Sequence, residues 1–132
     1  MEKLIDLAYK VLNNSYSPYS GIKIGAVVVG GSGKIYTGTN IENAAYGSTI
    51  CAERVAIFKA ISEGEKEIAQ IVITGNFDGY ANPCGACRQV MSEFMKKDGK
   101  IIICNRNIAH KEYTLSDMLP NIFTHEAKGI QK

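Results

Sequence analysis

Two short apolar runs rich in β-branched residues, separated by a helical segment, constrain the fold of this chain most strongly. Residues Ile68–Thr74 and Ile101–Cys104 have the length and composition of buried strands. Residues 84–97 between them carry apolar residues at helical spacing, and Pro83 precedes them where prolines favour a helix start. A strand–helix–strand unit of this kind is typical of parallel strands in a sheet that helices cover on both faces.

The remaining segments extend this α/β pattern. We expect a helix over residues 2–14, a hairpin of strands 22–29 and 35–40, a helix over 51–63, a short strand at 111–114 and a short helix at 115–119. The sequence therefore predicts a three-layer α/β/α sandwich. Its centre would be a five-stranded mixed sheet, rich in parallel pairs, with an antiparallel N-terminal hairpin at one side. The length suits a single domain, residues 1–132.

Charge and hydropathy exclude several classes of protein. The formal net charge of +2 comes from 15 basic and 13 acidic residues that are interspersed, so we expect no nucleic acid and no membrane as partner. The longest apolar runs are strand-sized, far below the roughly 18 residues of a membrane helix. The first residues, Met-Glu-Lys-Leu-Ile-Asp, place charges where a secretory signal would have its apolar centre. We therefore expect a cytoplasmic protein with reduced cysteines.

Three cysteines form the most informative pattern in the chain. Cys84 and Cys87 are spaced C-x-x-C at an expected helix start, where the helix dipole and free amides favour thiolates. Cys51 begins the preceding helix, and helices that follow parallel strands begin at the same edge of a sheet. Three thiolates can therefore converge on one Zn²⁺ and leave its fourth position open, as in catalytic sites. C-x-x-C alone is equally compatible with a redox pair, and Cys104 as a fourth ligand would give a closed structural site.

Charged residues beside the cysteines suggest how such a site works. Glu53 is the candidate general acid and base. Because residues two apart point to opposite sides of a helix, Cys51 and Glu53 can meet one pocket only across the helix N-terminus. Three thiolates and one Zn²⁺ leave a net negative charge. We expect Arg54 and Arg88 to offset that charge by donating hydrogen bonds to the sulfurs.

The order Cys51-Ala52-Glu53, then Pro83-Cys84-Gly85-Ala86-Cys87, resembles the motif of the zinc nucleobase deaminases. More specifically, the chain is similar to the small, homotetrameric, three-cysteine cytidine deaminases. The segments that carry this resemblance are Tyr16–Gly21, Thr39–Tyr46, Cys51–Arg54, Pro83–Val90 and Leu119–Pro120. They occur in the family's order and span nearly the whole chain.

The resemblance implies a hydrolase that deaminates cytidine and 2′-deoxycytidine to the corresponding uridines and ammonia. It implies one Zn²⁺ per chain, held by Cys51, Cys84 and Cys87, with Glu53 as the proton shuttle for the attacking water.

The resemblance also implies where a nucleoside would bind. Asn40 and Glu42 match the family residues that hydrogen-bond the ribose, and the backbone at Ala52 would contact the pyrimidine. Tyr46 lies in a loop that reaches a neighbouring subunit's site, and Phe123 matches an aromatic residue that covers the base from another subunit. These two residues would make the sites of a homotetramer shared between subunits.

Ile22 departs from the family, which usually carries an aromatic residue at this position. An isoleucine can pack against the substrate but gives up ring stacking worth about 0.5–1.5 kcal/mol. Ile22 therefore keeps a second substrate class open, a modified aminopyrimidine nucleoside. From a different class of protein, a non-catalytic zinc module is the further alternative.

Overall fold

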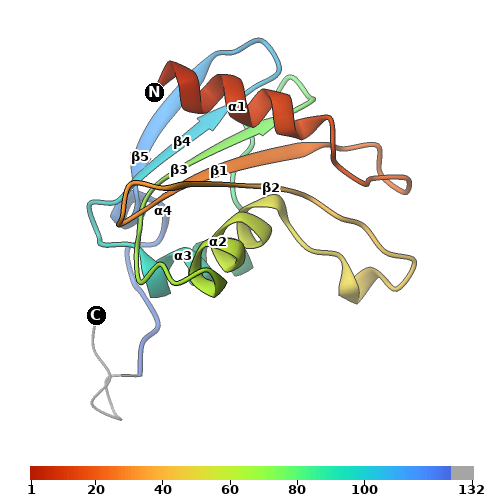
Figure 1. Cartoon of the computed structure of the whole chain (residues 1–132). Coiled ribbons are helices and arrows are strands. Elements are labelled where there is room, and N and C mark those ends of the chain that lie inside the picture. Colours follow the sequence, from red (N-terminus) through yellow and green to blue (C-terminus); the bar gives the residue numbers. More distant parts are fainter. Residues whose placement is uncertain (126–132) are drawn as a thin grey trace.

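A mixed sheet of five strands forms the middle layer of the protein, whose computed structural model describes residues 1–125 (Figure 1). The strands are β1 (Ile24–Gly30), β2 (Ile35–Thr39), β3 (Ile68–Gly75), β4 (Lys100–Cys104) and β5 (His110–Thr114). They lie in the order β2-β1-β3-β4-β5. The predicted five-stranded mixed sheet with an N-terminal hairpin is confirmed.

The pairing of the strands differs from the expectation in one respect. β3 and β4 pair in parallel, whereas β1 pairs antiparallel with both β2 and β3, and β5 pairs antiparallel with β4. The predicted richness in parallel pairs is therefore wrong. The reason is that β1 lies between β2 and β3 and separates them. These two strands nevertheless run in the same direction, because each is antiparallel to β1.

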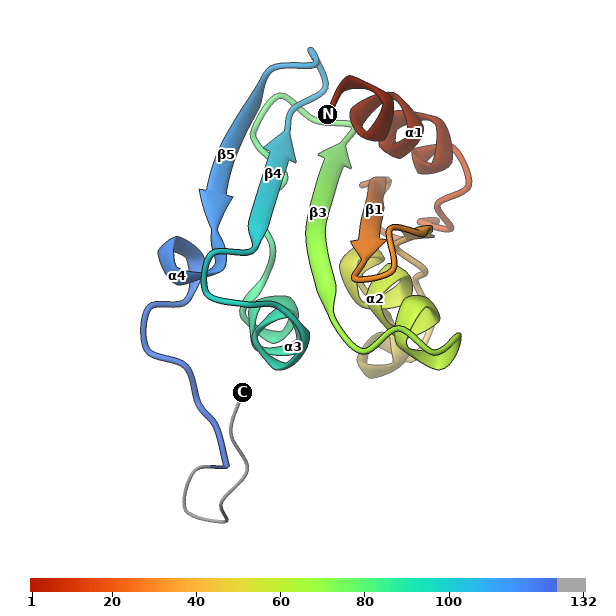
Figure 2. The same cartoon turned by 60° about the vertical axis from the view of Figure 1, so that its left-hand side comes forward.

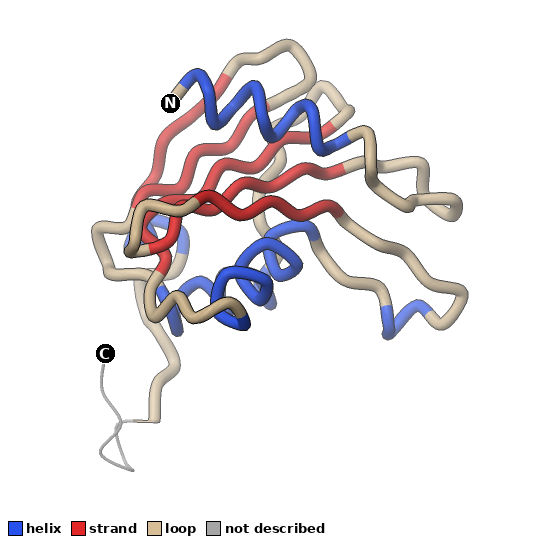
Figure 3. Tube along the Cα trace, viewed as in Figure 1, coloured by secondary structure: helices blue, strands red, loops and turns tan. Residues whose placement is uncertain are grey.

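Helices cover both faces of the sheet, as Figures 2 and 3 show. Helix α1 (Glu2–Leu12) packs on one face, and α2 (Ala52–Ser62), α3 (Gly85–Phe94) and α4 (Leu115–Met118) pack on the other. A short 3₁₀ helix, η1 (Tyr46–Ser48), lies in the loop before α2. The predicted three-layer α/β/α sandwich is confirmed. None of the helices in the described part of the chain has the length and hydropathy to cross a membrane.

Burial on both faces explains the β-branched runs of the sequence. In β1, Ala26 and Val28 pack in the core beneath α2 and α3, whereas Val27 packs against α1. Val72 of β3 and Ile102 of β4 lie on the same α1 side. Successive side chains of a strand point to opposite faces. A strand that helices cover on both faces therefore needs apolar residues at almost every position.

The helices are shorter than their sequence patterns predict. The helix expected over residues 84–97 ends at Phe94, and Met95 has an extended backbone with φ −111° and ψ 147°. Met95 packs in the core, so the chain turns inward there instead of continuing along the surface. The helix expected over residues 2–14 ends at Leu12.

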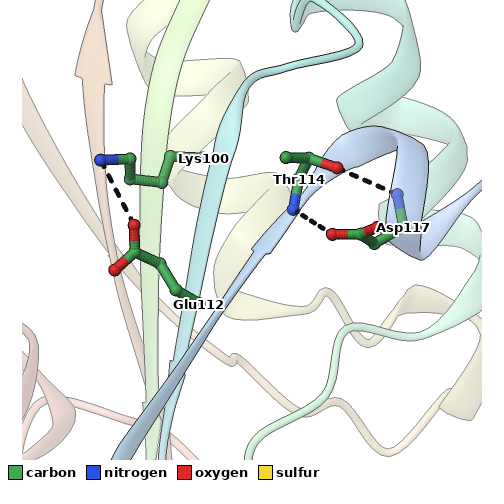
Figure 4. Close-up of polar contacts among 4 residues, drawn as sticks. All are labelled: Lys100, Glu112, Thr114 and Asp117. Carbon is green, nitrogen blue, oxygen red and sulfur yellow. Dashed lines mark hydrogen bonds and ion pairs between the residues drawn. The ribbon is translucent and has the colours of Figure 1, made fainter.

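Polar contacts join β4, β5 and α4 at one side of the sheet (Figure 4). Lys100 Nζ lies 3.3 Å from Glu112 Oε1. Thr114 Oγ1 accepts a hydrogen bond of 3.1 Å from Asp117 N, and Asp117 Oδ2 accepts one of 2.9 Å from Thr114 N. This reciprocal cap starts α4 directly after β5. It places Met118, the last residue of α4, within reach of α3.

A glycine allows α2 to lie directly on β2. A Cβ atom added at Gly38 would lie 2.6 Å from both Ala52 O and Ala56 N. Both atoms belong to the helix backbone and cannot move aside like a flexible side chain. This close approach fixes the first turn of α2, and with it Cys51 at the start of the helix.

We expect Gly38→Ala to destabilise the protein by about 1–3 kcal/mol, because the new methyl group must displace α2 from the sheet. The change in the free energy of unfolding can be measured by urea denaturation. Gly79→Ala is the matched control, since a Cβ atom there would meet only the Phe77 ring, at 3.7 Å. Equal stability of the two variants would contradict the close contact.

Candidate active site

Three cysteines lie at the starts of two helices. Cys51 is the N-cap of α2, Cys84 is the N-cap of α3, and Cys87 lies in the first turn of α3. α2 follows β2 and α3 follows β3 in the chain, and these strands run in the same direction. Both helices therefore begin at the same edge of the sheet, and the three cysteines converge as the sequence predicts.

The sulfur atoms of this cysteine triad have spacings that suit a zinc ion. Cys51 Sγ lies 3.9 Å from Cys84 Sγ, which lies 3.5 Å from Cys87 Sγ. All three atoms lie within 4.8 Å of one another. Tetrahedral ligands at the usual Zn–S distance of about 2.3 Å are about 3.8 Å apart. The triad can therefore hold one zinc ion, and it supplies three of four tetrahedral ligands.

The fourth cysteine belongs to another part of the protein. Cys104, at the end of β4, is buried in the cluster that packs against α1. Cys87 is buried in the cluster on the opposite face of the sheet. Cys104 therefore does not close the triad into a four-cysteine structural site.

An arginine lies against the triad. Arg54 Nη2 donates a hydrogen bond of 3.3 Å to Cys51 Sγ. Hydrogen bonds from the Cys87 thiol and from Arg54 lower the pKa of the Cys51 thiol. Arg54 Nε is buried and has no hydrogen-bond partner among the described residues. The guanidinium is thus placed where its positive charge can offset negative charge on the sulfurs.

Arg88 has a different place from the one predicted. Its Nε donates to Pro83 O at 2.9 Å, and its Nη1 donates to Met118 O at 2.9 Å. These bonds tie the residue before Cys84 to the end of α4. Arg88 therefore braces the backbone that carries a ligand, and its hydrogen bonds within the described chain go to carbonyl oxygens instead of sulfurs.

Glu53 is buried beside the triad. Its side chain belongs to the first turn of α2 and the residue is only 5% exposed. Burial raises the pKa of the Glu53 carboxyl to about 7, the charge of Cys51 adds to this rise, and a hydrogen bond from Cys87 opposes it. A carboxyl group with such a pKa can both accept and donate a proton near neutral pH.

Asn40 is buried where β2 ends, and its side chain organises the neighbouring loop. Asn40 Oδ1 accepts hydrogen bonds from Ser15 Oγ at 2.5 Å and from Ile24 N at 2.9 Å, and its Nδ2 donates to Ile22 O at 2.8 Å. An amide nitrogen carries two hydrogens. One of them is therefore left for a further acceptor, as far as the described residues show.

Glu42 lies at one wall of an open cavity of about 370 Å³. Its carboxylate accepts hydrogen bonds from Tyr19 N at 2.9 Å and from the backbone and hydroxyl of Ser20. The hydrogen bond from the Ser20 hydroxyl lowers the pKa of the Glu42 carboxyl most. The hydrogen bonds from the backbone N–H groups of Tyr19 and Ser20 lower it further. Tyr46 and Thr49 line the same cavity.

The apolar residues expected at the substrate are exposed. Ile22 is 48% exposed, Tyr46 77% and Phe123 71%. The Tyr46 ring lies edge-on to Tyr19, and Phe123 O accepts a hydrogen bond from Gln89 Nε2 of α3. Ala52, the first residue of α2, is by contrast fully buried.

The comparisons with known proteins agree with this geometry. Residues 1–105 match the family described as "Cytidine and deoxycytidylate deaminase zinc-binding region". The chain belongs to this deaminase family. The family membership inferred from the cysteine and glutamate motifs is thereby confirmed.

Members of this deaminase family resemble the chain over almost its whole length. A cytidine deaminase of Halalkalibacterium halodurans is 42% identical over 125 residues, which is 95% of each chain. One of Sporosarcina psychrophila is 40% identical and covers 96% of this chain and 93% of its own. The crystal structure of cytidine deaminase from Burkholderia pseudomallei has a TM-score of 0.88 at 39% identity, covering 92% of this chain and 98% of that one.

The deaminase family and the open triad together argue against the two other readings of the cysteines. A redox pair would need only Cys84 and Cys87 and would leave Cys51 and the buried Glu53 without a role. A non-catalytic zinc module would need a fourth ligand in place of an open position.

Proposed function

We propose that the protein is a zinc-dependent deaminase that converts cytidine and 2′-deoxycytidine to uridine and 2′-deoxyuridine with release of ammonia. The observation that carries this proposal is a three-sulfur site with the buried Glu53 carboxyl beside it. We assign the activity to one catalytic domain, residues 1–132. We also propose that it acts in the cytoplasm, because the four cysteines are free thiols, which suits a reducing compartment.

Cys51, Cys84 and Cys87 would hold one Zn²⁺. When bound, zinc supplies a Lewis acid that makes a water molecule nucleophilic at neutral pH. The N-termini of α2 and α3, together with Arg54, stabilise the negative charge of the thiolates in such a site.

Glu53 would move the protons of the reaction. Its carboxylate takes a proton from the water that attacks C4 of the pyrimidine and delivers it to N3. The same carboxyl group then takes the remaining proton from the new C4 hydroxyl and carries it to the departing amine, which leaves as ammonia while the C4 carbonyl forms. A carboxyl group that must change its protonation state twice benefits from the raised pKa that burial provides.

The nucleoside would lie between the triad and the loops of residues 15–24 and 40–49. The remaining Nδ2 hydrogen of Asn40 and the carboxylate of Glu42 would bind the ribose hydroxyls. The backbone at Ala52 would contact the pyrimidine, and Ile22 would pack against the base or the ribose.

We further propose that the protein is a homotetramer whose sites are shared between subunits. Tyr46 and Phe123 are exposed, although both are large aromatic residues. Phe58 on the outer side of α2 is also 45% exposed. Neighbouring subunits would cover these side chains. Tyr46 and Phe123 of one subunit would then reach the nucleosides bound in the sites of its neighbours.

Product analysis by chromatography tests the substrate class. Zinc-loaded protein should convert cytidine and 2′-deoxycytidine and leave free cytosine almost unchanged, because cytosine lacks the ribose that Asn40 and Glu42 would bind. Equal turnover of cytosine would contradict the assignment of these two residues.

We expect Arg54→Gln to lower the zinc affinity, kcat/KM or both by about 10- to 100-fold. The reason is that Cys51 would lose its charged hydrogen-bond donor. Competition with a chelating dye measures the zinc affinity, and initial rates with cytidine measure kcat/KM. Arg106→Gln is the control, since Arg106 is an exposed residue whose ion pair in the described part of the chain is with Asp78, at 3.6 Å. Equal zinc affinity and activity in both variants would show that Arg54 does not support the site.

A further inference from the structure

We propose that Asn76 is a positioning residue that fixes Ile22, so that the segment Gly21–Ile24 forms a rigid wall of the nucleoside site. This inference rests on the proposed function and deepens it. It assigns a role to a side chain that the cysteine and glutamate motifs do not include.

The segment Gly21–Ile24 enters β1 at the edge of the sheet where β2 and β3 end. The sequence predicts a strand from residue 22, but β1 begins at Ile24. Asn40 follows the last residue of β2, and Asn76 follows the last residue of β3. Because β1 lies between these two strands, the two asparagines flank the segment from opposite sides.

Asn76 makes three hydrogen bonds to this segment. Its Oδ1 accepts from Lys23 N at 2.9 Å, and its Nδ2 donates to Gly21 O at 3.0 Å. Its backbone N–H donates to Lys23 O at 3.1 Å. The Asn76 side chain thus binds residues 21 and 23, in the way that a neighbouring strand would bind alternate residues.

Asn40 binds the other two residues of the segment. Its amide contacts Ile22 O and Ile24 N, and its backbone N–H donates to Ile24 O at 3.3 Å. The two asparagines therefore form an asparagine clamp, which we define as Asn40 and Asn76 around Gly21–Ile24. The clamp continues the hydrogen bonding of the sheet beyond the ends of β2 and β3, the two strands that flank β1.

The backbone of the clamped segment is fully hydrogen-bonded. The N–H of Gly21 donates to Ser17 O at 2.9 Å, and that of Ile22 donates to Ser20 Oγ at 3.0 Å. Every other N–H and C=O group of the segment is bound by the clamp. Ile22 is thus an exposed apolar side chain on an immobilised backbone, which suits a surface that a ligand covers.

The clamp also links this wall to the chain that carries the metal ligands. Asn76 begins the loop that leads from β3 to Cys84. Asn40 belongs to the proposed ribose site. Of the two clamp residues, Asn76 is the one without a proposed contact of its own to the nucleoside, so its effect must pass through Ile22.

Steady-state kinetics of the zinc-loaded protein with cytidine tests this role. Asn76→Ala should raise KM about fivefold or more and leave kcat within about twofold, since it removes binding that is equal in the ground and transition states. Asn76→Asp keeps the acceptor for Lys23 N but loses the donor to Gly21 O. It should give an intermediate KM, and it provides a milder variant if Asn76→Ala folds poorly.

A double-mutant cycle separates this role from a general effect on stability. If Asn76 acts through Ile22, adding Asn76→Ala to Ile22→Ala should change KM by less than about twofold. Asn105→Ala is the matched control, because Asn105 Oδ1 also accepts two backbone hydrogen bonds, from Asn107 N and Ala109 N, in the turn between β4 and β5. Its KM should equal that of the wild type.

The possible outcomes are distinct. An active wild type with an unchanged KM in Asn76→Ala would overturn the role of Asn76 alone. Additive effects of the Asn76 and Ile22 substitutions would overturn it as well. A wild type that binds zinc but does not convert cytidine would overturn the proposed function and, with it, this inference.

Discussion

Glu53→Gln should reduce the rate of cytidine deamination by at least about a thousandfold while zinc stays bound, because an amide cannot accept and return a proton. The substitution removes the charge of a side chain that is buried beside the cysteine triad but changes its shape little. The rate is measured with purified zinc-loaded protein, and the bound metal is quantified by mass spectrometry.

Glu63→Gln is the matched control for this experiment. Glu63 is an exposed residue at the other end of α2, so its variant should keep both the activity and the zinc of the wild type. Substantial activity in Glu53→Gln, or loss of its zinc, would show that Glu53 is not the proton carrier.

Replacing one cysteine of the triad should remove both zinc and activity. Cys84→Ala leaves two sulfur ligands on two different helices, and we expect the protein to be purified with little zinc and to lose activity by at least about a thousandfold. Zinc content and rates with cytidine measure the two effects.

Cys104→Ala separates a catalytic site from a closed structural site. Cys104 lies on the α1 side of the sheet, so its replacement should leave one zinc per chain in place. Loss of zinc from Cys104→Ala, or retention of zinc and activity by Cys84→Ala, would contradict the three-cysteine site.

The cysteine site could be predicted because its spacing translates directly into geometry. Cys51 and Cys84 each precede a strong helix pattern, and helices that follow strands of one direction begin at one edge. The structure shows this arrangement, although the two strands are separated by β1. The predicted convergence of the cysteines depends only on β2 and β3 running in the same direction. It therefore holds even though these strands are not paired with each other, contrary to the expected richness in parallel pairs.

Contacts made by side chains with backbone groups could not be predicted in the same way. Arg88 follows Cys87 directly, and its sequence position suggested a bond to the sulfurs. Its guanidinium instead finds carbonyl oxygens of Pro83 and of Met118, which is 30 residues away in the sequence. Asn76 is a single asparagine after a strand, and such residues occur in most loops. Its role becomes visible only when the sheet places β1 beside β3.

Ultraviolet absorbance of cytidine, followed over minutes after addition of the purified zinc-loaded protein, tests the proposed activity most directly. Deamination predicts a change from the spectrum of cytidine to that of uridine, and no such change with Glu53→Gln. An unchanged spectrum with a folded, zinc-loaded wild type would contradict cytidine deamination. In that case, the departure at Ile22 would make modified aminopyrimidine nucleosides the next substrates to test.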